Sequence, residues 1–173
     1  MKYFISVFSV LVVVIVLFVV GSMPNENEEY LRIHIRANSN SEIDQAIKYE
    51  IRDSVVDALI PILANCKTKD EAETSLKNNL VFIEKTADAI LLSHGFSYGS
   101  KAKIANEQFP TRSYENLTLE SGFYDALIIE LGEAKGDNWW CVVYPPFCFL
   151  QTNNPQNIEY ISLLWNQIRA WLN

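Results

Sequence analysis

The chain has 173 residues, of which 49% are apolar, and it carries a formal net charge of −7. This length suits one domain with additional segments, large enough to bury about 70% of its unfolded surface in a core. The acidic balance excludes nonspecific binding to nucleic acid and a polybasic membrane-binding patch, because both depend on clustered lysine and arginine.

The N-terminal segment, residues 1–23, has the features of an export signal. Lys2 precedes an apolar stretch from Tyr3 to Val20, and small residues follow it, as in secretory signal peptides. The stretch is longer than a usual signal core of ~7–15 residues and nearly long enough to span a hydrocarbon core of ~30 Å. A cleaved signal peptide and a retained membrane anchor therefore both fit. Either one places the rest of the chain outside the cytoplasmic membrane.

Residues 24–29 form an acidic linker, and residues 30–150 form the predicted extracytoplasmic domain, which begins with a strand. Apolar residues alternate from Tyr30 to Ala37 with Arg32, His34 and Arg36. Such alternation is typical of a half-buried strand. We expect the basic row to be a solvated outer face or, alternatively, a contact row for an acidic partner or an anion.

Two helical segments are predicted next. Ser41 is the expected N-cap of the first, which carries apolar residues at helical spacing and which Pro61 should kink or end. Thr68 and Glu71 have capping-box spacing at the start of the second. This second helix can be interrupted at residues 78–79, and Gly95 ends it.

The following segments are rich in strand-forming residues. We expect strands at residues 96–104, 114–119, 123–131 and 139–144, with the last two paired as a β-hairpin across a Gly/Asp/Asn loop. An amphipathic helix is expected within residues 151–173, where apolar residues again recur at helical spacing, packed on the domain. Helices grouped against consecutive strands predict an α+β fold with a mainly antiparallel sheet.

Aromatic residues are concentrated at the end of this predicted hairpin. Trp139 and Trp140 are adjacent, so on a strand they point to opposite faces. One should join the core, while the other faces water, a packed helix or a partner. Binding energy often concentrates in Trp, Tyr and Arg side chains. The candidate partner-binding residues are Trp139, Trp140, Asp137, Asn138, Arg32 and Arg36.

Cys141 and Cys148 flank a Pro-Pro pair in the same region. Outside the cytoplasm they can form a disulfide, or they can remain reduced and pack as small hydrophobes. Cys66 is left over.

Few residues are suited to catalysis. The sequence has no Gly-x-Ser-x-Gly motif and no phosphate-binding glycine-rich loop. Its two histidines, His34 and His94, do not have metal-ligand spacing, and His34 with Cys141 is the best available base–nucleophile pair. We therefore expect no catalytic residues, no metal and no cofactor.

Several blocks of the sequence together resemble one family. These blocks are Leu31-Arg-Ile-His-Ile-Arg-Ala-Asn-Ser39, Asp44-Gln45 with Lys48 and Ile51-Arg52-Asp53, Phe109-Pro110-Thr111, and Gly136-Asp-Asn-Trp-Trp-Cys-Val-Val-Tyr-Pro-Pro-Phe-Cys148. The combination resembles the stage II sporulation protein R family, and the resemblance extends from about residue 31 to 150.

The resemblance implies a secreted signalling protein of endospore-forming bacteria, exported from the forespore into the space between the two compartment membranes. Its implied partner is a membrane-embedded aspartic protease, which on activation removes the pro-sequence of sigma-E in the mother cell. If residues 1–23 are uncleaved, the membrane is a second partner. The alternatives are an envelope-binding module that uses Trp residues to bind glycan or lipid, and an exported hydrolase that uses Cys141 or Asp137.

Overall fold

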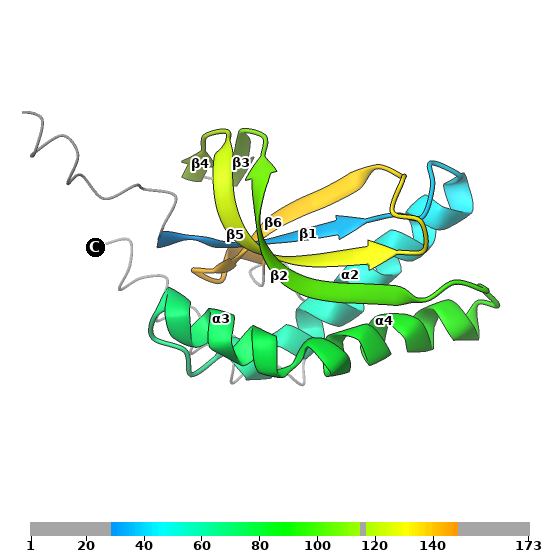
Figure 1. Cartoon of the computed structure of the whole chain (residues 1–173), viewed down its shortest axis with the longest axis horizontal. Helices are drawn as coiled ribbons and strands as arrows, with labels where there is room; N and C mark the ends of the chain where they lie inside the picture. Colours follow the sequence, from blue (N-terminus) through cyan, green and yellow to red (C-terminus); the bar gives the residue numbers. More distant parts are fainter. Residues whose placement is uncertain (1–28, 115–116, 149–173) are drawn as a thin grey trace, which may run out of the picture.

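The computed structural model describes residues 29–114 and 117–148. Helices lie against one face of a four-stranded sheet, and a two-stranded hairpin lies over one end of the other face (Figure 1). The predicted α+β class is confirmed for this part of the chain. The predicted signal or anchor at residues 1–23, nearly all of the linker, and the predicted helix within residues 151–173 lie outside the described residues.

The sheet is mixed, and its strand order corrects one prediction. The order is β2 (Ser100–Phe109), β5 (Gly122–Leu131), β1 (Leu31–Arg36) and β6 (Asn138–Tyr144), in which β1 and β5 are parallel and the other pairs are antiparallel. The predicted hairpin of residues 123–131 with 139–144 is therefore wrong, because β1 lies between these strands. Residues 126–129 are all buried, as is typical of a strand that is covered on both faces and has a parallel neighbour.

Two other strand predictions shift. The strand expected at residues 96–104 is β2, which begins at Ser100 and continues to Phe109. The single short strand expected at residues 114–119 is instead the hairpin of β3 (Arg112–Tyr114) and β4 (Leu117–Leu119). Strand propensity identified the right segments, but it did not predict the residues at which each strand begins and ends.

The helices begin and end close to the predicted residues. In α2 (Glu42–Leu63), the Ser41 hydroxyl accepts a hydrogen bond from the backbone N–H of Asp44, and the helix ends two residues after Pro61. In α3 (Lys69–Asn78), the Thr68 hydroxyl accepts from the N–H of Glu71, as predicted. Asn79 separates α3 from α4 (Leu80–Ser93), and Gly95 follows with a φ of +76°. No helix in the described ranges is long and apolar enough to cross a membrane.

Two apolar clusters lie on opposite faces of the sheet. The larger one joins Ile33 and Ile35 of β1 to the apolar faces of all three helices. The smaller one lies on the face without helices and includes Phe109, Tyr124 and Leu119. We call this second side the open face. Both faces of β1 are therefore covered.

Candidate functional site

Two loops meet at one end of the sheet and form what we call the loop junction, residues 37–41 and 132–137. The N–H of Gly136 donates to the carbonyl of Ala37 (2.9 Å), and the N–H of Lys135 donates to the carbonyl of Asn38 (3.1 Å). The side chain of Asn40 accepts from the N–H of Asp137 at 2.6 Å. These bonds fix the loop that leads into β6 against the loop that leads into α2.

Asp44 lies beneath the loop junction and is only 5% exposed. Its carboxylate accepts hydrogen bonds from the Ser39 hydroxyl (2.5 Å), the Asn38 amide (2.9 Å) and the Tyr98 hydroxyl (2.5 Å). Burial alone would raise the pKa of Asp44, but these hydrogen bonds together lower the pKa below its usual value. Asp44 is therefore held as a carboxylate that binds three surrounding side chains.

Lys48 connects α2 to the same junction. Its ammonium group is almost fully buried and donates to the Gln45 side chain at 2.7 Å and to the carbonyl of Asp137 at 3.1 Å. Burial lowers the pKa of Lys48, whereas the charge of Asp137 raises it. Asp44, Gln45 and Lys48, which carried part of the family resemblance, thus hold the loop junction in place.

The junction places the predicted aromatic candidates at the edge of the sheet. Asp137 and Asn138 are exposed, and β6 then directs Trp139 and Trp140 to opposite faces, where both are half-buried. Trp139 lies on the side of the helices. Trp140 lies on the open face, where its ring stacks on His34 at a centroid distance of 3.6 Å. The opposite orientation agrees with the alternation expected of a strand.

Helix α2 adds two residues that the sequence analysis did not select. The Arg52 guanidinium lies 5.7 Å from the centroid of the Trp139 ring and 4.9 Å from that of Tyr49, which is 44% exposed. We call Tyr49, Arg52, Trp139, Asp137 and Asn138 the aromatic surface. Arg52 stood within a family-like block, but nothing in the sequence marked Tyr49 beyond its place on the polar side of the helix.

The basic row of β1 corrects another prediction. It is not a solvated face, because Arg32 is 0% exposed and His34 is 1% exposed. The Arg32 guanidinium lies 4.3 Å from the centroid of the Phe109 ring and donates to the Tyr114 hydroxyl at 2.6 Å. Arg32 is therefore enclosed by aromatic residues and is not available as an exposed partner contact.

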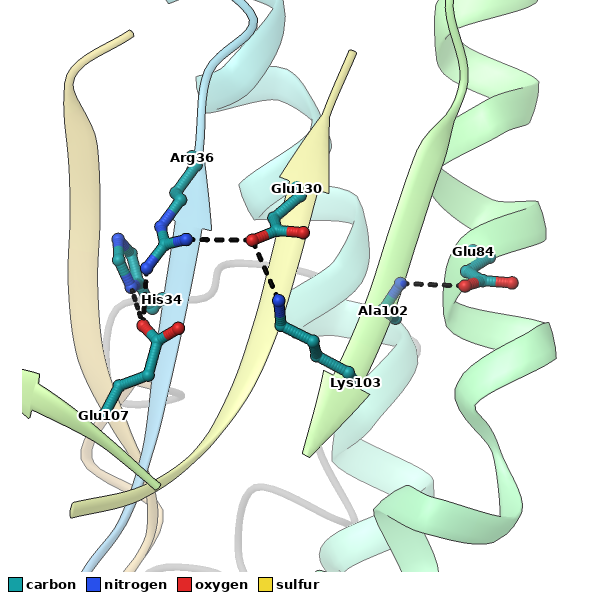
Figure 2. Close-up of polar contacts among 7 residues, drawn as sticks. All are labelled: His34, Arg36, Glu84, Ala102, Lys103, Glu107 and Glu130. Carbon is teal, nitrogen blue, oxygen red and sulfur yellow. Dashed lines mark hydrogen bonds and ion pairs between the residues drawn. The ribbon is translucent and has the colours of Figure 1, made fainter. Parts of the chain in front are cut away.

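Charged side chains form a ladder across the open face (Figure 2). Arg36 donates to Glu107 at 2.6 Å and to Glu130 at 2.8 Å, and Lys103 donates to the same Glu130 oxygen at 3.0 Å. His34 lies 3.3 Å from Glu107. Burial lowers the pKa of His34, so the neutral imidazole is favoured at neutral pH. Arg36 is thus committed to ion pairs within the domain.

The cysteines and histidines form no catalytic arrangement within the described ranges. The structure joins Cys141 to Cys148 through a disulfide, with their Cα atoms 6.0 Å apart, and Cys66 is free and buried. His34 and Cys141 lie on opposite faces of the sheet. No group of three or more His, Cys, Asp or Glu side chains in these ranges is arranged to hold a metal ion.

The disulfide leads to a mass-spectrometric prediction. Exported protein that is unfolded and alkylated without reductant should gain one alkyl group, on Cys66, whereas prior reduction should raise the number to three because it frees Cys141 and Cys148. Three alkyl groups without reduction would show that these two cysteines are thiols in the exported protein.

Comparison with known proteins gives two matches. A family model described as stage II sporulation protein R matches residues 27–154. A Bacillus subtilis (strain 168) protein named stage II sporulation protein R is 32% identical over 132 residues, which cover 76% of this chain and 59% of that relative. The chain therefore spans less than two thirds of the length of the curated relative that it matches. No solved structure matches.

Proposed function

The chain belongs to the stage II sporulation protein R family, which gives it a role in sporulation, and from this membership we propose that it is an exported signalling protein. It acts between the forespore and mother-cell membranes, where it binds and activates a membrane-embedded aspartic protease. The protease then removes the pro-sequence of sigma-E in the mother cell. The chain contributes binding and no bond-making step.

One structural observation supports this proposal most strongly. Sequence blocks that are far apart, around residues 37–48 and 136–141, converge at the loop junction and hold the aromatic surface next to it. Tyr49 is exposed, and Trp139 and Arg52 are partly exposed beside it. Trp, Tyr and Arg side chains are enriched at the centres of protein interfaces. A surface fixed before binding also loses less conformational entropy when the complex forms.

A binding protein can activate an enzyme without taking part in its chemistry. A ligand shifts a conformational equilibrium only as far as it binds one state more tightly than the other. The aromatic surface would supply that difference if it contacts only the active state of the protease. The activating effect should therefore depend on side chains such as Tyr49, which is exposed and does not belong to the core.

The proposal is tested by deleting the gene in the organism that encodes this chain. We expect pro-sigma-E to accumulate unprocessed, and a second copy of the gene with its export segment should restore processing. Normal processing in the deletion strain would contradict the proposal.

The aromatic surface makes a more specific prediction. Tyr49→Ala should reduce processing of pro-sigma-E at least tenfold, because truncation of a central interface aromatic typically costs about 2 kcal/mol or more of binding energy. Tyr49→Phe keeps the ring and should retain processing within about twofold. Immunoblots of the precursor and the mature sigma factor give the readout. Processing by Tyr49→Ala that matches the unmodified chain at equal protein levels would exclude Tyr49 from the interface.

A further inference from the structure

Strand β2 is an edge of the sheet, and its backbone directions can be assigned from two hydrogen bonds. The N–H of Ser100 donates to Asp88 at 2.6 Å. The N–H of Ala102 donates to Glu84 at 2.8 Å, as Figure 2 shows. Both acceptors are on α4, so these two N–H groups point away from β5. Because backbone groups alternate in direction along an antiparallel strand, Ile104, Asn106 and Gln108 also direct their N–H and C=O groups outward.

The two parts of this edge differ. Helix α4 closes it at residues 100 and 102, but within the described ranges no group accepts a hydrogen bond from the outward N–H groups of residues 104, 106 and 108. An open strand edge is a template for another strand, and proteins commonly block such edges. Here the blocking carboxylates cover only the first part of the strand. With respect to the part of the chain that the structure describes, residues 104–108 are open for pairing.

The other edge of the sheet is different. Beside β6, the turn after Tyr144 folds back, so that the sulfur of Cys148 lies 2.8 Å from the carbonyl oxygen of Val142. The chain also continues from this turn beyond the described residues. Strand β2 is therefore the better edge for an added strand.

The charges beside β2 indicate the chemistry of an added strand. Lys101 and Lys103 project on the open face, where Arg36 and Lys103 share one oxygen of Glu130 and Arg36 also binds Glu107. Lys101 makes no ion pair within the described ranges. Both lysines precede the open residues 104–108, where Glu107 lies on the same face. An incoming acidic side chain is therefore favoured beside Lys103, at the start of the open part, and not beside Glu107. On the opposite face, half-buried Ile104 favours an apolar neighbour.

We propose that residues 104–108 of β2 bind an extended segment of a protein partner by strand addition, with an acidic side chain of that segment beside Lys103 and an apolar side chain beside Ile104. Main-chain hydrogen bonds supply affinity in this mode, and the alternating side chains supply specificity. A second copy of this chain is a poorer occupant, because each copy carries a net charge of −7 and like charges repel. The identification of the partner as a protein rests on the proposed function.

The direct test removes one outward N–H group. Asn106→Pro should leave the ladder with β5 intact, because proline is tolerated at the outward positions of edge strands. We expect it to reduce processing of pro-sigma-E at least tenfold when it is co-expressed with the protease. Asn106→Ala is the matched control, because it loses the same side-chain bond to Asp125 but keeps the backbone N–H. This variant should support normal processing of pro-sigma-E.

Folding and the mode of binding are measured separately. Circular dichroism and thermal unfolding establish whether Asn106→Pro is folded, and a folded variant that still supports processing would overturn strand addition while leaving the proposed function standing.

If that variant does not fold, amide hydrogen exchange of the unmodified chain decides. Added protease in detergent should protect the N–H groups of residues 104, 106 and 108, and unchanged exchange there would overturn the inference. A dimer of the chain alone that already protects these N–H groups would overturn it in favour of self-pairing.

Discussion

We expect Gly136→Ala to lower the free energy of unfolding by about 2–3 kcal/mol, the usual cost of forcing extra volume into a packed site. A Cβ atom at Gly136 would overlap the backbone carbonyl of Ser39 and approach the Ala37 side chain. Neither group is a flexible side-chain end, so the two loops would have to separate. The hydrogen bond from the Gly136 N–H to the carbonyl of Ala37 would be weakened at the same time. Urea unfolding of the folded domain gives the measurement.

Gly95→Ala is the matched control for this substitution. Gly95 has a φ of +76°, but a Cβ atom there would meet nothing within 4 Å. Its replacement should cost only the strain of a left-handed backbone, about 1 kcal/mol. A cost for Gly136→Ala no greater than that for Gly95→Ala would show that the loop junction is not tightly packed.

The second large effect is expected at Asp44. Asp44→Ala should destabilise the domain by about 3 kcal/mol, because three half-buried donors lose their acceptor and each costs about 1 kcal/mol, the lower end of the range for a buried donor. The donors affected are the Ser39 hydroxyl, the Asn38 amide and the Tyr98 hydroxyl. The loop junction would lose one of its anchors to α2, so processing of pro-sigma-E should fall together with stability.

Asp44 also sets a dependence of stability on pH. Its pKa is lowered in the folded protein, so the stability that it contributes is present above the unfolded pKa of about 3.9 and is lost as the pH falls through the folded pKa. Asp44→Asn removes this titration. The difference in unfolding free energy between the original chain and Asp44→Asn should be largest near neutral pH and shrink below about pH 4. A difference that stays constant down to pH 2 would contradict this assignment.

The helices of the domain could be predicted from the sequence because their signals are local. The hydroxyls of Ser41 and Thr68 accept bonds from N–H groups three residues away, and Gly95 takes the backbone conformation that ends a helix. Each signal depends on a few neighbouring residues and on no distant contact. The interruption before α4 was visible for the same reason, in residues 78–79.

The strand order could not be predicted in this way. The 132–137 loop looked like a hairpin turn, but its backbone binds residues 37 and 38, which are almost a hundred positions earlier in the chain. That non-local contact places β6 beside β1, on the side of β1 that faces away from β5. Alternation in β1 correctly assigned its two faces, but it could not show that aromatic residues from β2, β3 and β5 would enclose Arg32.

The candidate site was predicted in part. Trp139, Trp140, Asp137 and Asn138 gather at the β6 edge, whereas Arg32 is buried and Arg36 is held by Glu107 and Glu130. Tyr49 and Arg52 were missed, because their proximity to Trp139 depends on how α2 crosses the sheet. The spacing of residues along one helix does not show how that helix crosses the sheet.

The central claim is that this domain activates the protease by binding it, and reconstitution tests the claim most directly. Residues 24–173, fused to an export signal, are co-expressed with the protease and its pro-sigma substrate in a bacterium that makes no spores, and the mature sigma factor is measured by immunoblot. We predict mature sigma factor only when the exported domain, the protease and the substrate are all present. Equal processing with and without the domain, or no processing when all three are present, would contradict the claim.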